Sequence, residues 1–235
     1  MRNIFSLFFN LFTVIWLGLT GSVLAQSGPT VVELYTSQGC SRCPPADEFL
    51  GRLAKRDDVI ALSLHVDYWD YMGWKDSFGG EQFTKRQHAY AYAANKSMVY
   101  TPQMVISGRH LLVGTKFSKV ESVINQRNKK ATPVHLQIEK QDGKLLIHAR
   151  SDQVIENMAV QLVQFSEGET VRVKRGENAG KELRYYNVVT QWTRLQNWDG
   201  AKPLSLSTKI SGVQGVVVII QEANYGAVLA AARLR

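Results

Sequence analysis

Two cysteines are the residues of this chain that most clearly can do chemistry. Cys40 and Cys43 are its only cysteines, and they stand two residues apart in the run TSQGCSRCPP, residues 36–45. Such a pair closes a short disulfide or presents a thiolate backed by a second thiol, and the two states interconvert by exchange with a partner's sulfur. The residue types leave three interpretations open: a redox pair, a structural disulfide, or two thiolate ligands for a soft metal such as Cu(I).

The ligands available argue against a structural zinc site and against covalently attached haem. A structural zinc site usually takes four protein ligands, whereas the five histidines form no HxxxH pattern and no second CxxC is present. Residue 44 is Pro rather than His, which excludes haem attachment at a CxxCH motif. We therefore expect no resident metal and no cofactor.

The N-terminus has the pattern of a secretory signal. Arg2 precedes an uncharged, mostly apolar stretch from Ile4 to Leu19, and Val23-Leu24-Ala25 places small or permissive residues before Gln26. We predict a signal peptide over residues 1–25 and a periplasmic or secreted mature protein without a membrane segment. The apolar stretch is also long enough for a retained anchor, although polar residues within it favour cleavage.

The charge of the chain points to no nucleic-acid partner. Removing residues 1–25 takes away one Arg and no acid, so the formal charge falls from +8 to +7. The basic residues are scattered, and Lys129-Lys130 is the longest Lys/Arg run. The excess indicates either attraction to anionic surfaces or a solvated basic surface, because a nucleic-acid footprint would require clustering and a recognisable motif.

The pattern of apolar residues divides the mature chain near residue 131. Before this point strands alternate with segments of helical period, and after it most segments alternate with a period of two. We predict an α/β domain over residues 26–131, with a central mixed sheet flanked by helices, and an antiparallel β-sandwich-like domain over residues 132–235. The predicted strands are 31–36, 59–66, 103–107 and 110–113 in the first half and 134–139, 145–149, 159–165, 171–174, 185–192, 204–207, 213–221 and 227–234 in the second. The predicted helices are 46–56, 81–96 and 117–127. The loop over residues 174–182 is rich in Gly, Asn and charge and is long enough to be functional.

The order of a strand, a CxxC at the start of a helix and a distant Thr-Pro before a hairpin strand resembles the thioredoxin fold. More narrowly, the passages VVELYTSQGCSRCPPAD, HVDYWDYMGWKDSF with RQHAYA, VYTPQMVISG, and RGENAGKEL with NVV resemble an exported bacterial family of unknown function with a thioredoxin-like domain. The thioredoxin resemblance implies that Cys40 is the nucleophile, that Cys43 is the resolving thiol, and that Thr101-Pro102 is the cis-proline loop facing them.

Elementary electrostatics is consistent with these roles. A thiolate ahead of a helix N-terminus experiences unpaired N–H groups and the positive end of the helix dipole, which lowers its pKa, and Arg42 adds a positive charge nearby. One departure from thioredoxin-type sites is that Ser41-Arg42 lies between the cysteines while Pro44-Pro45 follows them. The helix is therefore predicted to begin near Cys43 or Pro44, which leaves Cys40 farther from the dipole.

Other candidates each have a functional and a structural interpretation. Glu33 interrupts an apolar strand and either relays protons to Cys43 or pairs with a structural partner, since burying it unpaired would be costly. His65 and Asp67 end a central strand and either act as ligand or acid–base groups or satisfy each other structurally. Aromatic residues follow that strand and either line a substrate groove or pack the segment onto the sheet; they include Tyr68, Trp69, Tyr71 and Trp74, together with Met72.

Three functions follow from these residues. The first is an exported thiol–disulfide oxidoreductase that exchanges disulfides with protein thiols and with a redox recycling partner. The second is a copper carrier or chaperone that uses both thiolates with Met104 or His65. The third is a non-catalytic interaction protein in which the disulfide pins a turn.

Overall fold

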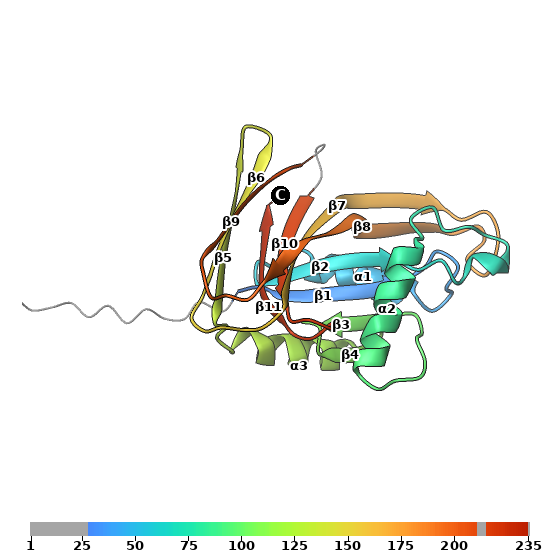
Figure 1. The fold of residues 1–235 in the computed structure, drawn as a ribbon. Coiled ribbons are helices and arrows are strands. Elements are labelled where there is room, and N and C mark those ends of the chain that lie inside the picture. The colour runs from blue at the N-terminus through green and yellow to red at the C-terminus, as the bar shows by residue number, and fades with distance from the viewer. Residues whose placement is uncertain (1–27, 211–214, 235) are drawn as a thin grey trace, which may run out of the picture.

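The computed structural model of the protein describes residues 28–210 and 215–234 (Figure 1). The predicted signal peptide, residues 1–25, lies outside the described residues. In the N-terminal half the strands are β1 (Thr30–Thr36), β2 (Val59–His65), β3 (Gln103–Ile106) and β4 (His110–Val113). The helices are α1 (Pro44–Leu53), α2 (Glu81–Ala93) and α3 (Phe117–Asn128), with a short 3-10 helix, η1 (Asp70–Met72). These strands and α-helices confirm the predicted order.

The C-terminal half consists of strands in the part that the structure describes. They are β5 (Val134–Gln141), β6 (Lys144–Ser151), β7 (Met158–Arg172), β8 (Glu182–Trp198), β9 (Leu204–Lys209), β10 (Gly215–Gln221) and β11 (Val228–Leu234). The two strands predicted at 159–165 and 171–174 are wrong as separate elements, because β7 runs through the first and into the second, ending at Arg172. The residues between them, SEGET, are polar, and they stay in the strand through antiparallel pairing with β8. A polar segment that is extended only because it pairs with a neighbouring strand cannot be recognised from apolar periodicity.

Helix α1 begins where the two prolines predict. Cys43 occupies the N-cap position, and Pro44 and Pro45 fill the first helical positions, where a missing N–H leaves no helical bond unmade. Its buried side chains pack with β1, β2, β3 and α3 in one core cluster. Burial of each large apolar side chain stabilises the fold by about 1.5–3 kcal/mol, so the helix that carries Cys43 rests on a well-packed face.

One eight-stranded mixed sheet runs through both halves of the chain, in the order β11-β10-β7-β8-β2-β1-β3-β4. Strand β1 is parallel to β2 and antiparallel to β3, and β4 is antiparallel to β3. The halves join where β2 pairs in parallel with β8 at Ser63 and Val188. The α/β class with a large mixed sheet and few flanking helices is confirmed. The predicted boundary near residue 131 does not separate two sheets, and the division into two domains stays a prediction.

The two faces of the sheet carry different layers (Figure 1). Helices α1 and α3 pack on one face of β1–β3. Helix α2 packs on the opposite face, where β10 and β11 also contribute. The remaining strands form a second, antiparallel sheet, β5-β6-β9, which packs against β7, β10 and β11. Among the described residues, no helix is long and apolar enough to cross a membrane.

Candidate functional site

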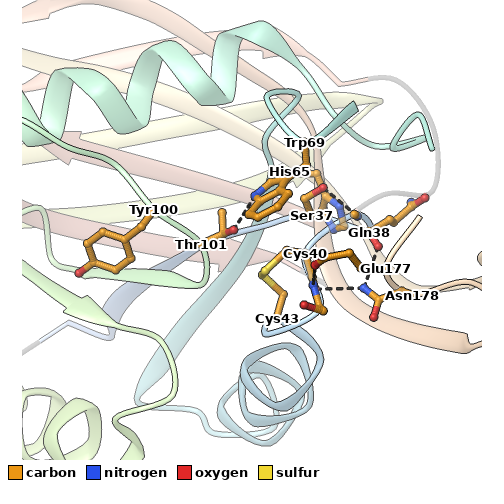
Figure 2. The surroundings of a disulfide bond; sticks show 12 residues. Ser37, Gln38, Cys40, Cys43, His65, Trp69, Tyr100, Thr101, Glu177 and Asn178 are labelled. Atoms are coloured by element: carbon orange, nitrogen blue, oxygen red, sulfur yellow. Dashed lines mark hydrogen bonds between the residues drawn. A yellow bond between two sulfur atoms is a disulfide. The ribbon is translucent and has the colours of Figure 1, made fainter. Parts of the chain in front are cut away.

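Cys40 and Cys43 form a disulfide at the N-terminus of α1 (Figure 2). Their Cα atoms are 5.4 Å apart, and the Cys43 N–H donates to the Cys40 carbonyl at 3.2 Å. Ser41 and Arg42, between them, are exposed. The cysteines are not: the exposed fraction is 1% for Cys40 and 0% for Cys43. The structure therefore places the disulfide directly below the surface.

Thr101 lies beside the disulfide in Figure 2, and Pro102 follows it in the chain. Their peptide bond is cis. The indole N–H of Trp69 donates to Thr101 Oγ1 at 2.8 Å, and Figure 2 shows both residues next to the two sulfur atoms. A Cβ added to Gly114 would lie 3.0 Å from Pro102 and 3.3 Å from Ala46, in the first turn of α1. This glycine allows the proline loop to approach the helix that carries Cys43.

The loop that leads into Cys40 is fixed by Gln38. Its backbone N–H donates to Asp76 Oδ2 at 2.7 Å, and its side chain accepts from the Trp74 indole N–H at 2.8 Å. His65 Nδ1 lies 2.8 Å from the same Asp76 oxygen. Burial opposes ionisation of Asp76, but His65 and two backbone N–H groups hold the pKa of this carboxyl below its usual value. His65 is thus a structural partner, as one interpretation predicted, but its partner is Asp76 and not Asp67.

A segment of the C-terminal half covers the CxxC loop on its other side. The turn between β7 and β8, residues 173–181, reaches this loop across about 138 positions of the sequence. Asn178 is fully buried, and its side-chain amide donates to the carbonyls of Gln38 at 2.9 Å and Cys40 at 3.0 Å. The Glu177 carboxylate lies 3.4 Å from the Ser41 N–H. The loop flagged as functional from its composition thus contacts the cysteine pair, although nothing in the sequence identifies the residues that make the contact.

Unpartnered buried polar atoms lie on β1, β2, β8 and the first turn of α1. In the described part of the chain, the buried side-chain atoms without a hydrogen-bond partner belong to Thr36, Asp47, Ser63, His65 and Tyr185. Thr36 pairs with His65 across β1 and β2, and the His65 and Tyr185 rings are 4.7 Å apart. Nothing in the sequence distinguishes Asp47 from the ordinary acid of a helix's first turn.

The environment of Asp47 favours its neutral form. Burial raises the pKa of the Asp47 carboxyl well above its ordinary value, and the nearby Thr36 hydroxyl only partly opposes this. The Asp47 N–H donates to the Cys43 carbonyl at 3.1 Å, one helical turn from the resolving position. Residues four apart on a helix share a face, so this carboxyl lies on the same side of α1 as Cys43.

Glu33 does not lie with these groups. Along β1 it points to the face that carries α2, opposite to α1, where its carboxylate accepts from Arg86 Nε at 2.7 Å and Arg86 Nη2 at 3.0 Å. The Tyr90 and Tyr35 hydroxyls donate to the same carboxylate at 2.7 and 3.0 Å. The proton-relay interpretation is corrected here, because strand alternation directs the side chain away from Cys43 and into a buried ion pair.

The aromatic residues after β2 mainly pack. Tyr68 and Trp69 are half-buried against the core cluster below α2, and Trp74 is half-buried against strands β7 and β8. Burial raises the pKa of Tyr68 to about 12, and its hydroxyl donates to Gln87 at 3.2 Å. Tyr71 remains 79% exposed. These contacts match the packing interpretation, and a substrate-binding role for Tyr68, Trp69 and Trp74 stays a prediction.

The residues invoked for copper binding are both buried, and among the described residues they are not part of a recognisable group of metal ligands. Met104 is fully buried in the core between α1 and the sheet, opposite Leu34 of β1. His65 Nδ1 is occupied by Asp76, whereas its Nε2 is buried without a hydrogen-bond partner. No group of three or more His, Cys, Asp or Glu side chains within residues 28–210 and 215–234 has the arrangement of a metal site.

Fold and site together define a mixed α/β protein with a CxxC disulfide at a strand–helix turn. Residues 31–221 of the chain match the family described as "Protein of unknown function (DUF1223)", and the chain belongs to this family. The fold is similar to an X-ray crystal structure of a protein from Agrobacterium tumefaciens, with a TM-score of 0.77 and 31% sequence identity. That likeness covers 89% of this chain and 96% of the other. No curated protein matches the chain.

Proposed function

We propose that this protein is an exported thiol–disulfide oxidoreductase that works through Cys40 and Cys43. The observation that carries the proposal is that its two cysteines are bonded to each other at the start of α1, with the Thr101–Pro102 loop beside them. The strand order β2-β1-β3-β4, with α1 and α3 on one face and α2 on the other, supports a thioredoxin-like arrangement of this half.

The exchange reaction would use both sulfur atoms in turn. In the oxidised protein, a client thiolate attacks Cys40 Sγ, a mixed disulfide forms, and the Cys40–Cys43 bond breaks to leave a Cys43 thiolate. A second client thiolate then attacks the client's own sulfur in the mixed disulfide and releases Cys40 as a thiolate. The client thiols lose two electrons and two protons in forming a disulfide, and the cysteine pair gains both. The reverse sequence reduces a client disulfide.

Asp47 is the group we propose for proton transfer at Cys43. A carboxyl whose pKa is raised by burial can hold a proton closer to neutral pH and exchange it with a thiol. Its position one turn along α1 and the unpartnered Oδ1 atom support this assignment. Glu33, which the sequence offered for the same role, is held on the other face by Arg86.

The proposed compartment and partners follow from the N-terminal pattern. A signal peptide over residues 1–25 would deliver the protein to the periplasm or outside the cell, where disulfides persist. The partners would be protein thiols or disulfides and a second redox protein that restores the pair.

The test has two parts. We expect Cys43→Ser to accumulate mixed disulfides through Cys40 in the periplasm of the producing cell, detected as thiol-sensitive adducts on non-reducing gels. The matched control is Cys40→Ser, which should form none, because in the proposed reaction the client bonds to Cys40 and Cys43 only resolves the mixed disulfide. Absence of adducts from both variants under oxidising conditions would count against the proposal.

The second part is the equilibrium of the pair with glutathione buffers, measured by alkylation mass shift. A midpoint between roughly −120 and −270 mV is expected of an exchanger. A pair that stays oxidised to below about −300 mV behaves as a structural disulfide. That result would overturn the proposal in favour of an interaction protein.

A further inference from the structure

The disulfide cannot be attacked in the arrangement that the structure shows. Thiol–disulfide exchange requires a thiolate to reach one of the two sulfur atoms. The exposed fractions of 1% for Cys40 and 0% for Cys43 leave no such approach. Some part of the wall around the disulfide must therefore move before any exchange occurs, and the contacts of each wall indicate which part.

Most of that wall belongs to the packed body of the protein. Helix α1 and strand β1 lie in the main core. Trp69 is pinned by its bond to Thr101, and a Cβ added to Gly39 would meet Trp69 at 3.0 Å, so these segments are in close contact. Moving α1 or β1 would disrupt apolar packing over a large area.

The β7–β8 turn is held much less extensively. Within residues 173–181, Val173 and Asn178 are buried and the rest are exposed. Strand β7 pairs with β10 only as far as Phe165, and β8 pairs with β2 at Val188. Beyond these points the two strands pair only with each other, and side chains of β8 pack on Trp74, Phe78 and α1. Of residues 173–181 only Val173 belongs to this buried cluster, so the rest of the turn is held mainly by hydrogen bonds.

The turn has internal bonds that keep its shape. The Gly180 N–H donates to the Val173 carbonyl at 2.8 Å, and the Lys181 N–H donates to the Asn178 carbonyl at 3.1 Å. Lys181 Nζ also donates to Asn178 Oδ1 at 2.9 Å, which orients the amide so that its N–H groups face the CxxC loop. A turn with these bonds can move as one unit.

We propose that residues 173–181 form a cover over the disulfide and that Asn178 is the positioning residue that keeps it closed. Figure 2 shows Asn178 and Glu177 beside Cys40, on the side away from Trp69 and Thr101. Opening breaks the two bonds from Asn178 to the carbonyls of Gln38 and Cys40 and exposes Cys40 Sγ to a thiolate. A turn of the C-terminal half thus controls whether a thiolate can reach Cys40.

This inference rests on the proposed function, since it concerns access to the same disulfide. Its test is nevertheless separate, because dithiothreitol reduces an accessible disulfide whether or not the pair is a natural exchanger. The measurement is the rate at which excess dithiothreitol reduces the oxidised full-length mature protein, followed by alkylation mass shift.

Asn178→Ala should be reduced about tenfold faster than the wild type. A tenfold change is equivalent to about 1.4 kcal/mol, within the range expected for the loss of two hydrogen bonds. The matched control is Asn187→Ala. Asn187 lies on the same hairpin, is 5% exposed, and donates to a backbone carbonyl of the N-terminal half, that of Ala61 at 2.8 Å. It has no bond to the CxxC loop, so its rate should match the wild type.

Lys181→Ala keeps the test decisive if Asn178→Ala does not fold. Lys181 is exposed, so its removal leaves no cavity, and the loosened amide should raise the rate about threefold. The cover is refuted if the rate of the folded test variant stays within a factor of about two of the wild type, or if Asn187→Ala is accelerated equally. A glutathione midpoint outside the exchanger range, together with faster reduction of Asn178→Ala, would refute the proposed function and leave the cover intact.

Discussion

Replacing Glu33 by Gln separates a structural role for this residue from a catalytic one. Glu33 is fully buried, and its carboxylate is the counterion of Arg86, whose side chain is 7% exposed. The guanidinium also lies 3.7 Å from the centre of the Trp192 ring. Glutamine keeps the size of the side chain but removes the charge and turns one acceptor into a donor that faces the donors of Arg86.

The expected loss of stability follows from this geometry. Removing one partner of a buried ion pair leaves an uncompensated charge and destabilises proteins by about 3–5 kcal/mol. A buried Asp or Glu can escape part of such a penalty by changing its protonation, but a guanidinium cannot lose its proton in a protein. Glu33→Gln should therefore lose about 3–5 kcal/mol of unfolding free energy. With an m-value of about 2 kcal/mol per M, the urea midpoint falls by roughly 2 M.

The assay is urea unfolding of the oxidised protein, followed by tryptophan fluorescence, with the glutathione midpoint measured on the same variant. The matched control is Lys85→Ala, on the same helix as Arg86. Lys85 pairs with Glu81 at 2.8 Å, but both side chains are largely exposed, at 70% and 73%. An exposed pair four residues apart contributes only about 0.2–0.5 kcal/mol, so the control should unfold near the wild-type midpoint.

Two results would refute this reasoning. A loss below about 1 kcal/mol would mean that the Glu33–Arg86 pair contributes no more to the free energy of unfolding than an exposed ion pair does. A normal unfolding midpoint combined with a large shift in the glutathione midpoint or in its pH dependence would restore the proton-relay role for Glu33.

Two further predictions concern buried groups at other positions. A carboxyl whose folded-state pKa is raised is most stabilising below its unfolded pKa, here 3.8, and that stability is lost as pH rises through the folded value. The stability of Asp47→Asn relative to the wild type should therefore be greater at pH 8 than at pH 4, as measured by urea melts. An equal difference in stability at the two pH values would contradict this. Gly108→Ala should be less stable than Gly143→Ala by about 1–3 kcal/mol. Both glycines have positive φ, +72° and +73°, but a Cβ would lie 2.2 Å from the Gly226 carbonyl oxygen at Gly108 and meets nothing at Gly143. Thermal or urea melts of the two variants decide this, and equal losses would exclude the close approach as a cause.

Much of the local structure could be predicted from the sequence. Strands β1 and β2 are mainly apolar runs, interrupted by Glu33 and Ser63. Helix α1 starts at Pro44 because residues 44 and 45 lack the N–H donors that a helix interior needs. The hairpin between β3 and β4 is set by Gly108, and the turn between β5 and β6 by Asp142-Gly143, where positive φ is required. Each of these features depends on residues close together in the chain.

The candidate site was only partly predictable, because some of its contacts join residues that are far apart in the chain. The pairing of Cys40 with Cys43 and the nearness of Thr101 and Pro102 were accessible through motif spacing and resemblance. The roles of Glu33, Asp47 and Asn178 were not, because each depends on which face of an element meets a partner far along the chain. Strand alternation shows that Glu33 and Leu34 point to opposite faces of the sheet, but it does not show that Arg86 lies on the face of Glu33.

The sequence by itself determined most elements of this protein and the position of its CxxC pair between a strand and a helix, since propensity, turn residues and spacing act over a few residues. Only the tertiary structure decided that β8 joins β2 and so places both halves in one sheet. Pairing between distant strands is chosen by the packing of whole faces and by backbone hydrogen bonds, which every residue can make, so it leaves little trace in residue types. That pairing brings Asn178 onto the carbonyl of Cys40 and thereby sets how the disulfide is reached.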